Sequence, residues 1–178
     1  MTKATYTNAE KKKAVRDFLF SYFQFNSILG LAGPDINEYI KWCKSKGYND
    51  FEIWENEPTV TMKQLSEVKY PVRYKFGNIL HATPDKNVLL DLDYCVSIRY
   101  MKEHLKKFKD NFIMTFSTRI GVKETINKFF KFRGEQITNQ YEFDGPGLQN
   151  IVFNTNLGKY LFITYCDTSA MCCFAKIN

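Results

Sequence analysis

The sequence predicts an α/β fold in three layers, namely an open, mostly parallel, twisted sheet with helices on both faces and an antiparallel β-hairpin at its C-terminal end. Strand-like apolar runs alternate with helix-spaced apolar stripes over residues 27–130. Residues 27–55 form a strand-helix-strand unit of roughly 30 residues, the usual size of a right-handed parallel crossover. The tail from residue 148 holds strand-like runs separated only by turn residues.

The first predicted element is an amphipathic helix over about residues 8–25. Thr7 and Glu10 have the spacing of a capping box, and apolar residues then recur at helical intervals. These residues are Ala14, Val15, Phe18, Leu19, Tyr22 and Phe23. Such a stripe indicates packing against another element. Two roles stay open for the helix, which could cover a ligand pocket or mediate association.

The remaining elements follow from the same periodicities. A helix is expected between Asp35, which suits its N-cap, and Gly47, which suits the left-handed position after its end. Three further helices are expected at 61–69, 98–108 and 122–130. Strands are expected at 27–31, 51–55, 72–76, 87–93, 112–116, 148–154, 159–165 and 170–177. A turn at Asp167-Thr168-Ser169 would close the final hairpin.

Composition favours one intracellular domain that spans residues 1–178. No apolar stretch approaches the ~18 residues of a membrane helix, which favours a cytoplasmic protein. The five cysteines include no C-x-x-C pair, so neither a zinc site nor a disulfide framework is indicated. The net charge of +6 favours an anionic partner such as nucleic acid, although it also suits an ordinary solubilising surface. Heavy use of Lys, Asn, Phe and Tyr is typical of an AT-rich genome, for example a viral one.

Ligands of such sheets bind outside the carboxyl ends of the strands. The first strand ends in a glycine-containing loop whose candidate ligand-binding residues are Gly30, Ala32, Gly33 and Asp35. Glycines allow a ligand to approach the backbone, and the next helix offers free N–H groups there. A plain strand-to-helix turn explains the same residues equally well.

Two further strand ends carry polar residues. Glu55, followed closely by Glu57, ends the second strand about where a carboxylate would bind ribose hydroxyls. Asn78 and Ile79 follow the third strand, where the Asn amide could pair with an adenine edge, although a simple turn is the competing interpretation.

The fourth strand ends in two carboxylates and a phenol, Asp91, Asp93 and Tyr94. Strand alternation predicts that the two aspartates point the same way, which places like charges together and perturbs their proton affinities. We therefore expect a catalytic role here, with capping of the next helix by Asp93 as the alternative.

In the order of its elements and in these four segments, the sequence resembles the class I S-adenosylmethionine-dependent methyltransferases. The resemblance covers about residues 27–177. It implies a seven-stranded sheet, S-adenosylmethionine bound across the first two loops, and a methyl acceptor over the fourth segment. In that scheme Asp91 or Asp93 would orient the acceptor and Tyr94 would stack on a base.

The sequence also departs from the family pattern. Gly30 stands where the family has an acid, Ala32 replaces a glycine, and the loop is one residue short. The fourth segment lacks the Asn/Asp-Pro-Pro-Tyr form of enzymes that methylate base amines. The leading hypothesis is methyl transfer to nucleic acid or another macromolecule, because the chain is small and carries a net positive charge. The alternatives are an inactive methyltransferase-like module that binds protein or nucleic acid, and an enzyme of other nucleotide chemistry.

Overall fold

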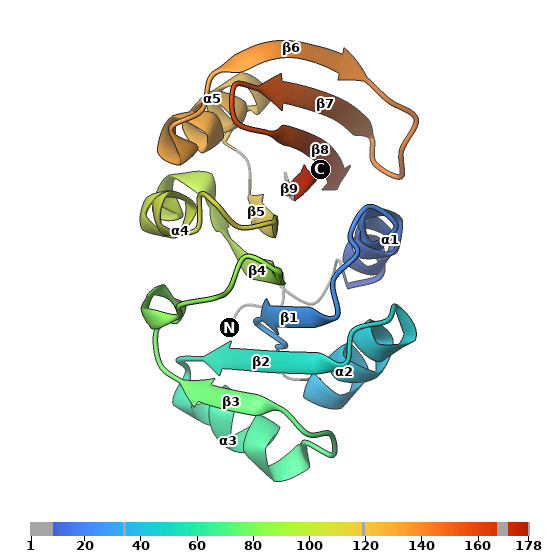
Figure 1. Cartoon of the computed structure of the whole chain (residues 1–178), viewed down its shortest axis with the longest axis vertical. Helices are drawn as coiled ribbons and strands as arrows, with labels where there is room; N and C mark the ends of the chain where they lie inside the picture. The colour runs from blue at the N-terminus through green and yellow to red at the C-terminus, as the bar shows by residue number, and fades with distance from the viewer. Residues whose placement is uncertain (1–8, 34, 119, 167–170, 178) are drawn as a thin grey trace.

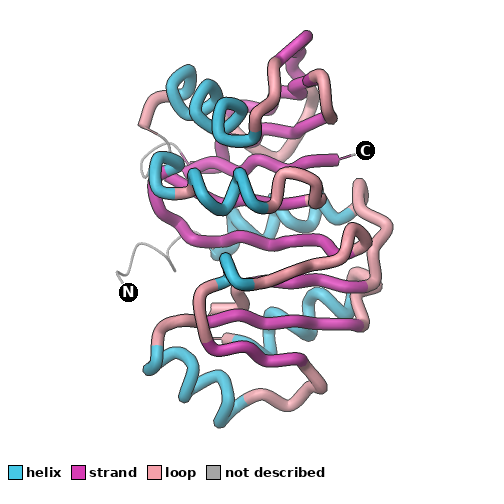
Figure 2. The backbone as a smooth tube through the Cα atoms, turned by 60° about the vertical axis from the view of Figure 1, so that its left-hand side comes forward, coloured by secondary structure: helices cyan, strands magenta, loops and turns pink. Residues whose placement is uncertain are grey.

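The computed structural model describes residues 9–33, 35–118, 120–166 and 171–177, apart from the side chains of Ala9, Tyr94 and Cys95. Within this part of the chain nine strands form one sheet, in the order β3-β2-β1-β4-β5-β9-β8-β7-β6 (Figure 1). The sheet is flanked by helices on both faces, as Figure 2 shows from a second direction. The predicted fold class is thus confirmed.

Five strands form the parallel half of the sheet. They are β1 (Ser27–Gly30), β2 (Asp50–Glu55), β3 (Arg73–Phe76), β4 (Val88–Ser97) and β5 (Ile113–Thr118). The register pairs Gly30, the last residue of β1, with Ile53 of β2 on one side and with Asp91 of β4 on the other. This register places the loops after β1, β2 and β3 at one edge of the sheet.

Four antiparallel strands complete the sheet. They are β6 (Ile137–Glu142), β7 (Gln149–Thr155), β8 (Lys159–Cys166) and β9 (Met171–Ile177). β9 pairs with β5, and β8 pairs with β9, so the predicted C-terminal hairpin is confirmed. The turn expected at Asp167-Thr168-Ser169 lies outside the described residues.

Helices cover the two faces in separate groups. α1 (Ala9–Phe20) and α2 (Ile36–Ser45) pack on one face, and α3 (Pro58–Glu67) lies beside α2 and β2. The other face carries the 3₁₀ turns η2 (Ile79–His81) and η3 (Ile98–Tyr100), with α4 (Lys102–Lys107) and α5 (Val122–Arg133). Each face has its own apolar core, and consecutive strand residues divide between them: Leu89 joins the first core and Leu90 the second.

Three sequence expectations need correction. The first helix ends at Phe20 rather than near residue 25, because the backbone N–H groups of Tyr22 and Phe23 turn back to the carbonyls of Leu19 and Phe20. The helix expected over 98–108 is broken into η3 and α4. The sheet has nine described strands instead of seven, since β6 and β7 extend its edge. All six residues of β6 are exposed, which explains why its sequence shows no apolar signal.

α1 is an integral part of the first core. Val15, Leu19, Phe20 and Phe23 are buried against the sheet, and α1 lies next to β8. No helix in the described residues is long and apolar enough to cross a membrane.

Candidate functional site

The ends of β1, β2 and β3 enclose a small cavity of about 130 Å³. Its walls come from Leu31 after β1, Asn56 after β2, the segment 77–79 after β3, and His104 of α4. Burial lowers the pKa of the half-buried His104, which favours the neutral imidazole. An amide, an imidazole and apolar side chains therefore face one another, which suits a flat heteroaromatic ring with donors and acceptors on its edge.

Asn78 and Ile79 both contribute to this cavity. Asn78 caps η2, because its Oδ1 accepts a hydrogen bond from the backbone N–H of Leu80 at 3.0 Å. Asn78 is therefore a turn residue and also lines the cavity. Ile79 is buried and belongs to the core under α4. Gly77 adopts a φ of +149°, a conformation that favours glycine, beside the ring of Trp54.

The glycine loop leaves β1 next to the cavity. The backbone N–H of Leu31 reaches the carbonyl of Asp91 at 3.4 Å, and Gly33 turns with a φ of +68°. The carbonyl of Gly33 accepts a hydrogen bond from the side chain of Gln64, which is fully buried in α3. Ala32 packs against the first core. The loop is thus held by α3, while a Cβ added to Gly33 would point into open space.

Asp35 and Glu55 each make contacts within their own part of this edge. The side chain of Asp35 is 77% exposed and makes a long ion pair of 3.8 Å with Lys63, without capping α2. Oε1 of Glu55 accepts hydrogen bonds from the backbone N–H groups of Asn56 and Glu57 at 2.9 and 3.0 Å. Glu57 caps α3 through the N–H of Val60. Glu55 therefore shapes the loop that bounds the cavity through one oxygen of its carboxylate, Oε1.

Asp91 and Asp93 point to the same face of the sheet, as strand alternation predicts, and meet two cations of α1 there. Nε and Nη2 of Arg16 each donate a hydrogen bond to the Asp91 carboxylate at 3.0 Å, and Nη2 also reaches Asp93 at 3.1 Å. Lys12 donates to Asp93 at 2.9 Å. Tyr39 of α2 completes the group by donating its hydroxyl hydrogen to Asp91 at 2.9 Å. The side chain of Tyr94 lies outside the described part.

This charge cluster is almost entirely removed from water. The exposed fractions of the side chains are 0% for Asp91, 11% for Arg16 and 15% for Asp93. The Arg16 guanidinium also lies 4.3 Å from the centroid of the Phe116 ring. Although burial alone would lower it, Asp91 and Asp93 raise the pKa of Arg16 well above its ordinary value. The pKa of Tyr39 is raised by burial and by Asp91, so its hydroxyl stays protonated and donates.

The sequence matches no family model and no curated protein. Solved structures do match the chain over nearly its whole length. The N-methyltransferase NodS from Bradyrhizobium japonicum aligns with 99% of this chain and 98% of its own, with 9% identity and a TM-score of 0.53. The fold is that of the class I methyltransferases. At this identity the likeness shows the architecture alone.

Two further structures show how widely this methyltransferase fold is used. The Pyrococcus abyssi tRNA (uracil-54, C5)-methyltransferase, solved with S-adenosyl-L-homocysteine, aligns with 95% of the chain at 11% identity and a TM-score of 0.51. Human N-acetylserotonin methyltransferase aligns with 99% at 9% identity and a TM-score of 0.54. The chain spans only 38% and 53% of those two proteins. Since one acts on tRNA and the other is named for a small molecule, the fold leaves the methyl acceptor undecided.

Within the methyltransferase fold the predicted site residues divide into two groups. Asn78 and Ile79 line the cavity, Gly33 lies in the loop after β1, and Glu55 is the last residue of β2. Gly30, Asp91 and Asp93 belong instead to the charge cluster beneath α1. The two groups meet at the end of β1, where Gly30 is paired with Asp91.

Sequence reasoning missed Lys12, Arg16 and Tyr39, which complete the cluster, and His104 in the cavity wall. A signal for the two cations is present in the sequence. Lys12 and Arg16 are four residues apart, so they share one side of the helix, next to its apolar stripe. A pair of buried carboxylates requires counter-charges, and such spaced cations can supply them.

Gly30 is required by the tight approach of Tyr39. A Cβ at this position would lie 2.5 Å from the Tyr39 hydroxyl oxygen and 3.4 Å from Cβ of Asp91. We expect Gly30→Ala to lower the free energy of unfolding by about 1–3 kcal/mol, because the hydroxyl is fixed by its bond to Asp91. Urea denaturation of Gly30→Ala, Tyr39→Phe and the double variant tests this. Removing the hydroxyl relieves the clash, so the double variant should lose less stability than the sum of the two. Strict additivity would contradict the explanation.

Proposed function

We propose that this protein binds S-adenosylmethionine at the carboxyl edge of the sheet and transfers its methyl group to an acceptor. The observation that supports this most directly is the cavity after β1, β2 and β3, with Asn78 and His104 in its wall. The cofactor would supply an electrophilic methyl group on a sulfonium. The chain itself contributes binding and orientation, which are the main demands of an in-line displacement.

The residues present fit the nucleoside part of the cofactor. Asn78, Ile79 and His104 would enclose the adenine, and Glu55 would accept hydrogen bonds from ribose hydroxyls with the oxygen that its own loop does not use. The cavity of about 130 Å³ is smaller than the roughly 300–1,000 Å³ of complete ligand pockets. The loop with Ala32, Gly33 and Asp35 is the segment that remains for the methionine part.

The two aspartates would have different tasks. Asp91 is fully buried and satisfied by Arg16 and Tyr39, so it positions α1 and α2 rather than touching an acceptor. Asp93 retains some exposure, and its carboxylate already accepts hydrogen bonds from Lys12 and Arg16. A carboxylate held by two cations serves better to orient an acceptor than to remove its proton. We propose nucleic acid as the acceptor, in keeping with the net charge of +6.

Calorimetric titration with S-adenosylmethionine and S-adenosylhomocysteine tests the cofactor site. We expect micromolar binding by the unmodified protein, weakened about 10- to 100-fold in Glu55→Gln. Glutamine keeps an oxygen that can accept from Asn56 and Glu57 but lacks the charge that favours ribose hydroxyls. Glu67→Gln is the control, because the Glu67 side chain forms an exposed ion pair with Lys63 at the far end of α3. Its affinity should equal that of the unmodified protein.

The second candidate function is that of a module with the methyltransferase fold that binds a protein or nucleic acid and does not catalyse methyl transfer. It is favoured by the Tyr39 hydroxyl at Gly30, where the family pattern has an acid, and by the pairing of both aspartates with α1. It predicts that the titration gives no heat with either compound. Binding of both, followed by transfer of labelled methyl groups to RNA or DNA, would exclude it.

A further inference from the structure

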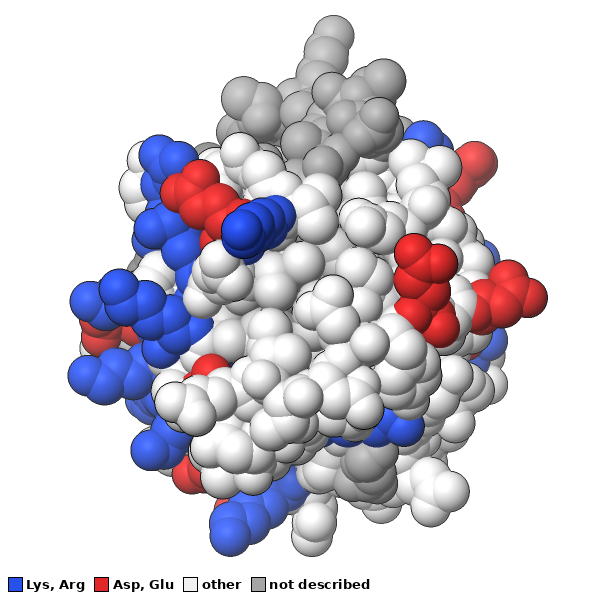
Figure 3. All heavy atoms as spheres, turned by 90° about the horizontal axis from the view of Figure 1, so that it is seen from above, with Lys and Arg blue, Asp and Glu red and all other residues white. Residues whose placement is uncertain are grey.

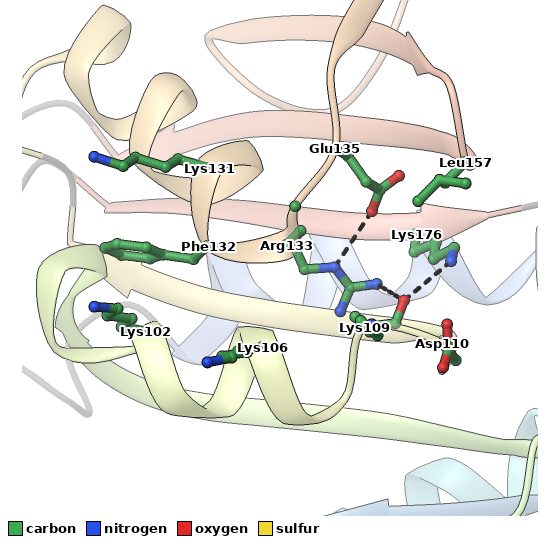
Figure 4. Close-up of a pocket in the computed structure, with 11 residues that line it drawn as sticks. Lys102, Lys106, Lys109, Asp110, Lys131, Phe132, Arg133, Glu135, Leu157 and Lys176 are labelled. Atoms are coloured by element: carbon green, nitrogen blue, oxygen red, sulfur yellow. Dashed lines mark hydrogen bonds and ion pairs between the residues drawn. The ribbon is translucent and has the colours of Figure 1, made fainter.

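A second concave surface lies between α4 and α5, away from the candidate cofactor cavity. This groove has a volume of about 580 Å³ (Figure 4). Its sides come from α4 and α5, and its end from Leu157 after β7 and Lys176 of β9. None of the four segments singled out as cofactor or acceptor sites contributes to it, so it requires a separate explanation.

The floor of the groove is formed by Arg133 and Glu135, whose opposite charges neutralise each other. Arg133 is buried at the end of α5 and donates to the carbonyls of Phe108 and Lys109 at 2.9 and 2.7 Å, which closes the C-terminal end of α4. Its guanidinium also pairs with Glu135 at 3.6 Å. Gly134 between them takes the left-handed conformation, with a φ of +70°. The two helices are thus held at a constant separation.

The walls of this groove are rich in lysine. The lining lysines are Lys102, Lys106, Lys109, Lys131 and Lys176, against the carboxylate of Asp110 and the internally paired Glu135. A shallower hollow along α5 continues this surface from Lys131 to Lys128 and Lys123. Figure 3 shows Lys and Arg side chains gathered along the side of the molecule that α4 and α5 occupy, while the middle of that view is nearly uncharged. The groove therefore presents concentrated positive charge.

Helix dipoles explain only part of this arrangement. Cations are stabilised at a helix C-terminus, which accounts for Lys106 and Lys131. Lys102 and Lys123 lie instead in the first turns of α4 and α5, where the dipole opposes a positive charge. Lys176 is held at 3.3 Å from the Lys109 carbonyl, and its pKa is lowered by burial and by the nearby Arg133. An anion in the groove would relieve these unfavourable interactions.

The groove also offers apolar surface between its charges. Phe132 projects from α5 alongside Lys131 and Lys102 (Figure 4), and Leu157 is 63% exposed. A basic groove that also carries an aromatic ring is typical of sites for single-stranded nucleic acid, whose phosphates meet the cations and whose bases stack. An acidic peptide would use the cations but would gain little from the ring.

We propose that the groove between α4 and α5 binds the backbone of single-stranded nucleic acid. The choice of nucleic acid over another polyanion rests on the proposed function and on the aromatic ring of Phe132, whereas the site itself rests on the lysine-lined groove. α4 links the two places, because His104 lies in the wall of the cofactor cavity while Lys102 and Lys106 line the groove. A strand in the groove would thus run along the helix that borders the proposed cofactor cavity.

Fluorescence anisotropy without any cofactor tests the proposal. The probe is a labelled oligothymidylate or oligouridylate of about 12 nucleotides, titrated between ~50 and ~200 mM salt. The variant carries Lys102→Gln, Lys106→Gln and Lys131→Gln. Loss of three phosphate contacts should reduce the slope of log K against log salt by about 2 and weaken binding by roughly 100-fold at ~0.1 M salt.

The matched control carries Lys41→Gln, Lys69→Gln and Lys75→Gln, which remove the same charge from exposed lysines around α2 and β3. This variant should bind as the unmodified protein does, and circular dichroism of both triple variants verifies folding. An equal loss in the two variants would mean that net charge alone attracts the oligonucleotide, which overturns the proposal. Equally effective competition by polyglutamate would also overturn it, in favour of an acidic protein partner. Since no cofactor is present, failure of S-adenosylmethionine binding leaves this result unaffected.

Discussion

Replacing Arg16 with methionine is expected to lower the free energy of unfolding by about 3–5 kcal/mol. Arg16 holds the fully buried Asp91 through two hydrogen bonds of 3.0 Å. Methionine fills a similar volume over Phe116 but supplies no charge, so Asp91 would keep the hydrogen bond from Tyr39 and lose both bonds from its cation. An ionised carboxylate without its cation is among the costliest groups to bury. Urea denaturation followed by circular dichroism measures the change.

The matched control is Arg73→Met. Arg73 also binds an aspartate, because Nη1 and Nη2 of its guanidinium both donate hydrogen bonds to Asp50. The two side chains, however, are 55% and 44% exposed. Exposed ion pairs contribute about 0–1 kcal/mol, so this variant should remain close to the unmodified protein. Similar losses in both variants would show that burial does not set the strength of the Arg16–Asp91 pair.

The pH dependence of Arg16→Met gives a further check with a defined sign. Burial raises the pKa of Asp91, and Arg16 is the main group that opposes this effect. Without Arg16 the pKa rises further, so the folded state binds a proton more readily than the unfolded state does. The variant should therefore regain stability as the pH falls toward 3.8, the ordinary pKa of the group. Adding Asp91→Asn, which removes the charge at every pH, should abolish this recovery.

Replacing Arg133 with methionine is the second change with a large expected effect, a loss of about 3–5 kcal/mol. The side chain of Arg133 is completely buried and donates to Tyr160 at 3.2 Å as well as to the two carbonyls that end α4. Methionine would leave Glu135 buried without its cation and would remove donors from both carbonyls. Thermal or urea unfolding measures the loss.

A conservative variant separates the effect of charge from that of geometry at Arg133, and a second variant, at an exposed arginine, serves as the control. Arg133→Lys keeps the charge but lacks the planar fork, so it should recover only part of the stability. Arg99→Met removes an exposed arginine from the nearby η3 turn and should change stability by no more than about 0.5 kcal/mol. If Arg133→Met were as harmless as Arg99→Met, the floor of the groove between α4 and α5 would not be the rigid unit inferred from its hydrogen bonds.

Local patterns in the sequence were sufficient for much of the fold. Alternating strand and helix periods predicted the parallel half of the sheet, and turn-separated strands predicted the antiparallel pair β8 and β9. The period of two along β4 also predicted correctly that Asp91 and Asp93 share a face. Each of these features depends on residues close together in the chain, where spacing alone decides which way side chains point.

Other features arise only when distant segments meet. Arg16 and Asp91 are 75 residues apart, and Arg133 meets Tyr160 across 27. β6 shows no apolar signal because it is exposed at the edge and is defined by its pairing with β7. The groove likewise needs α4 and α5 side by side. The sequence by itself determined the layers, the strand directions and the carboxyl-edge loops, because local periodicity encodes them. Only the tertiary structure decided which charges neutralise the buried aspartates and where lysines of separate helices gather, because those outcomes depend on long-range packing.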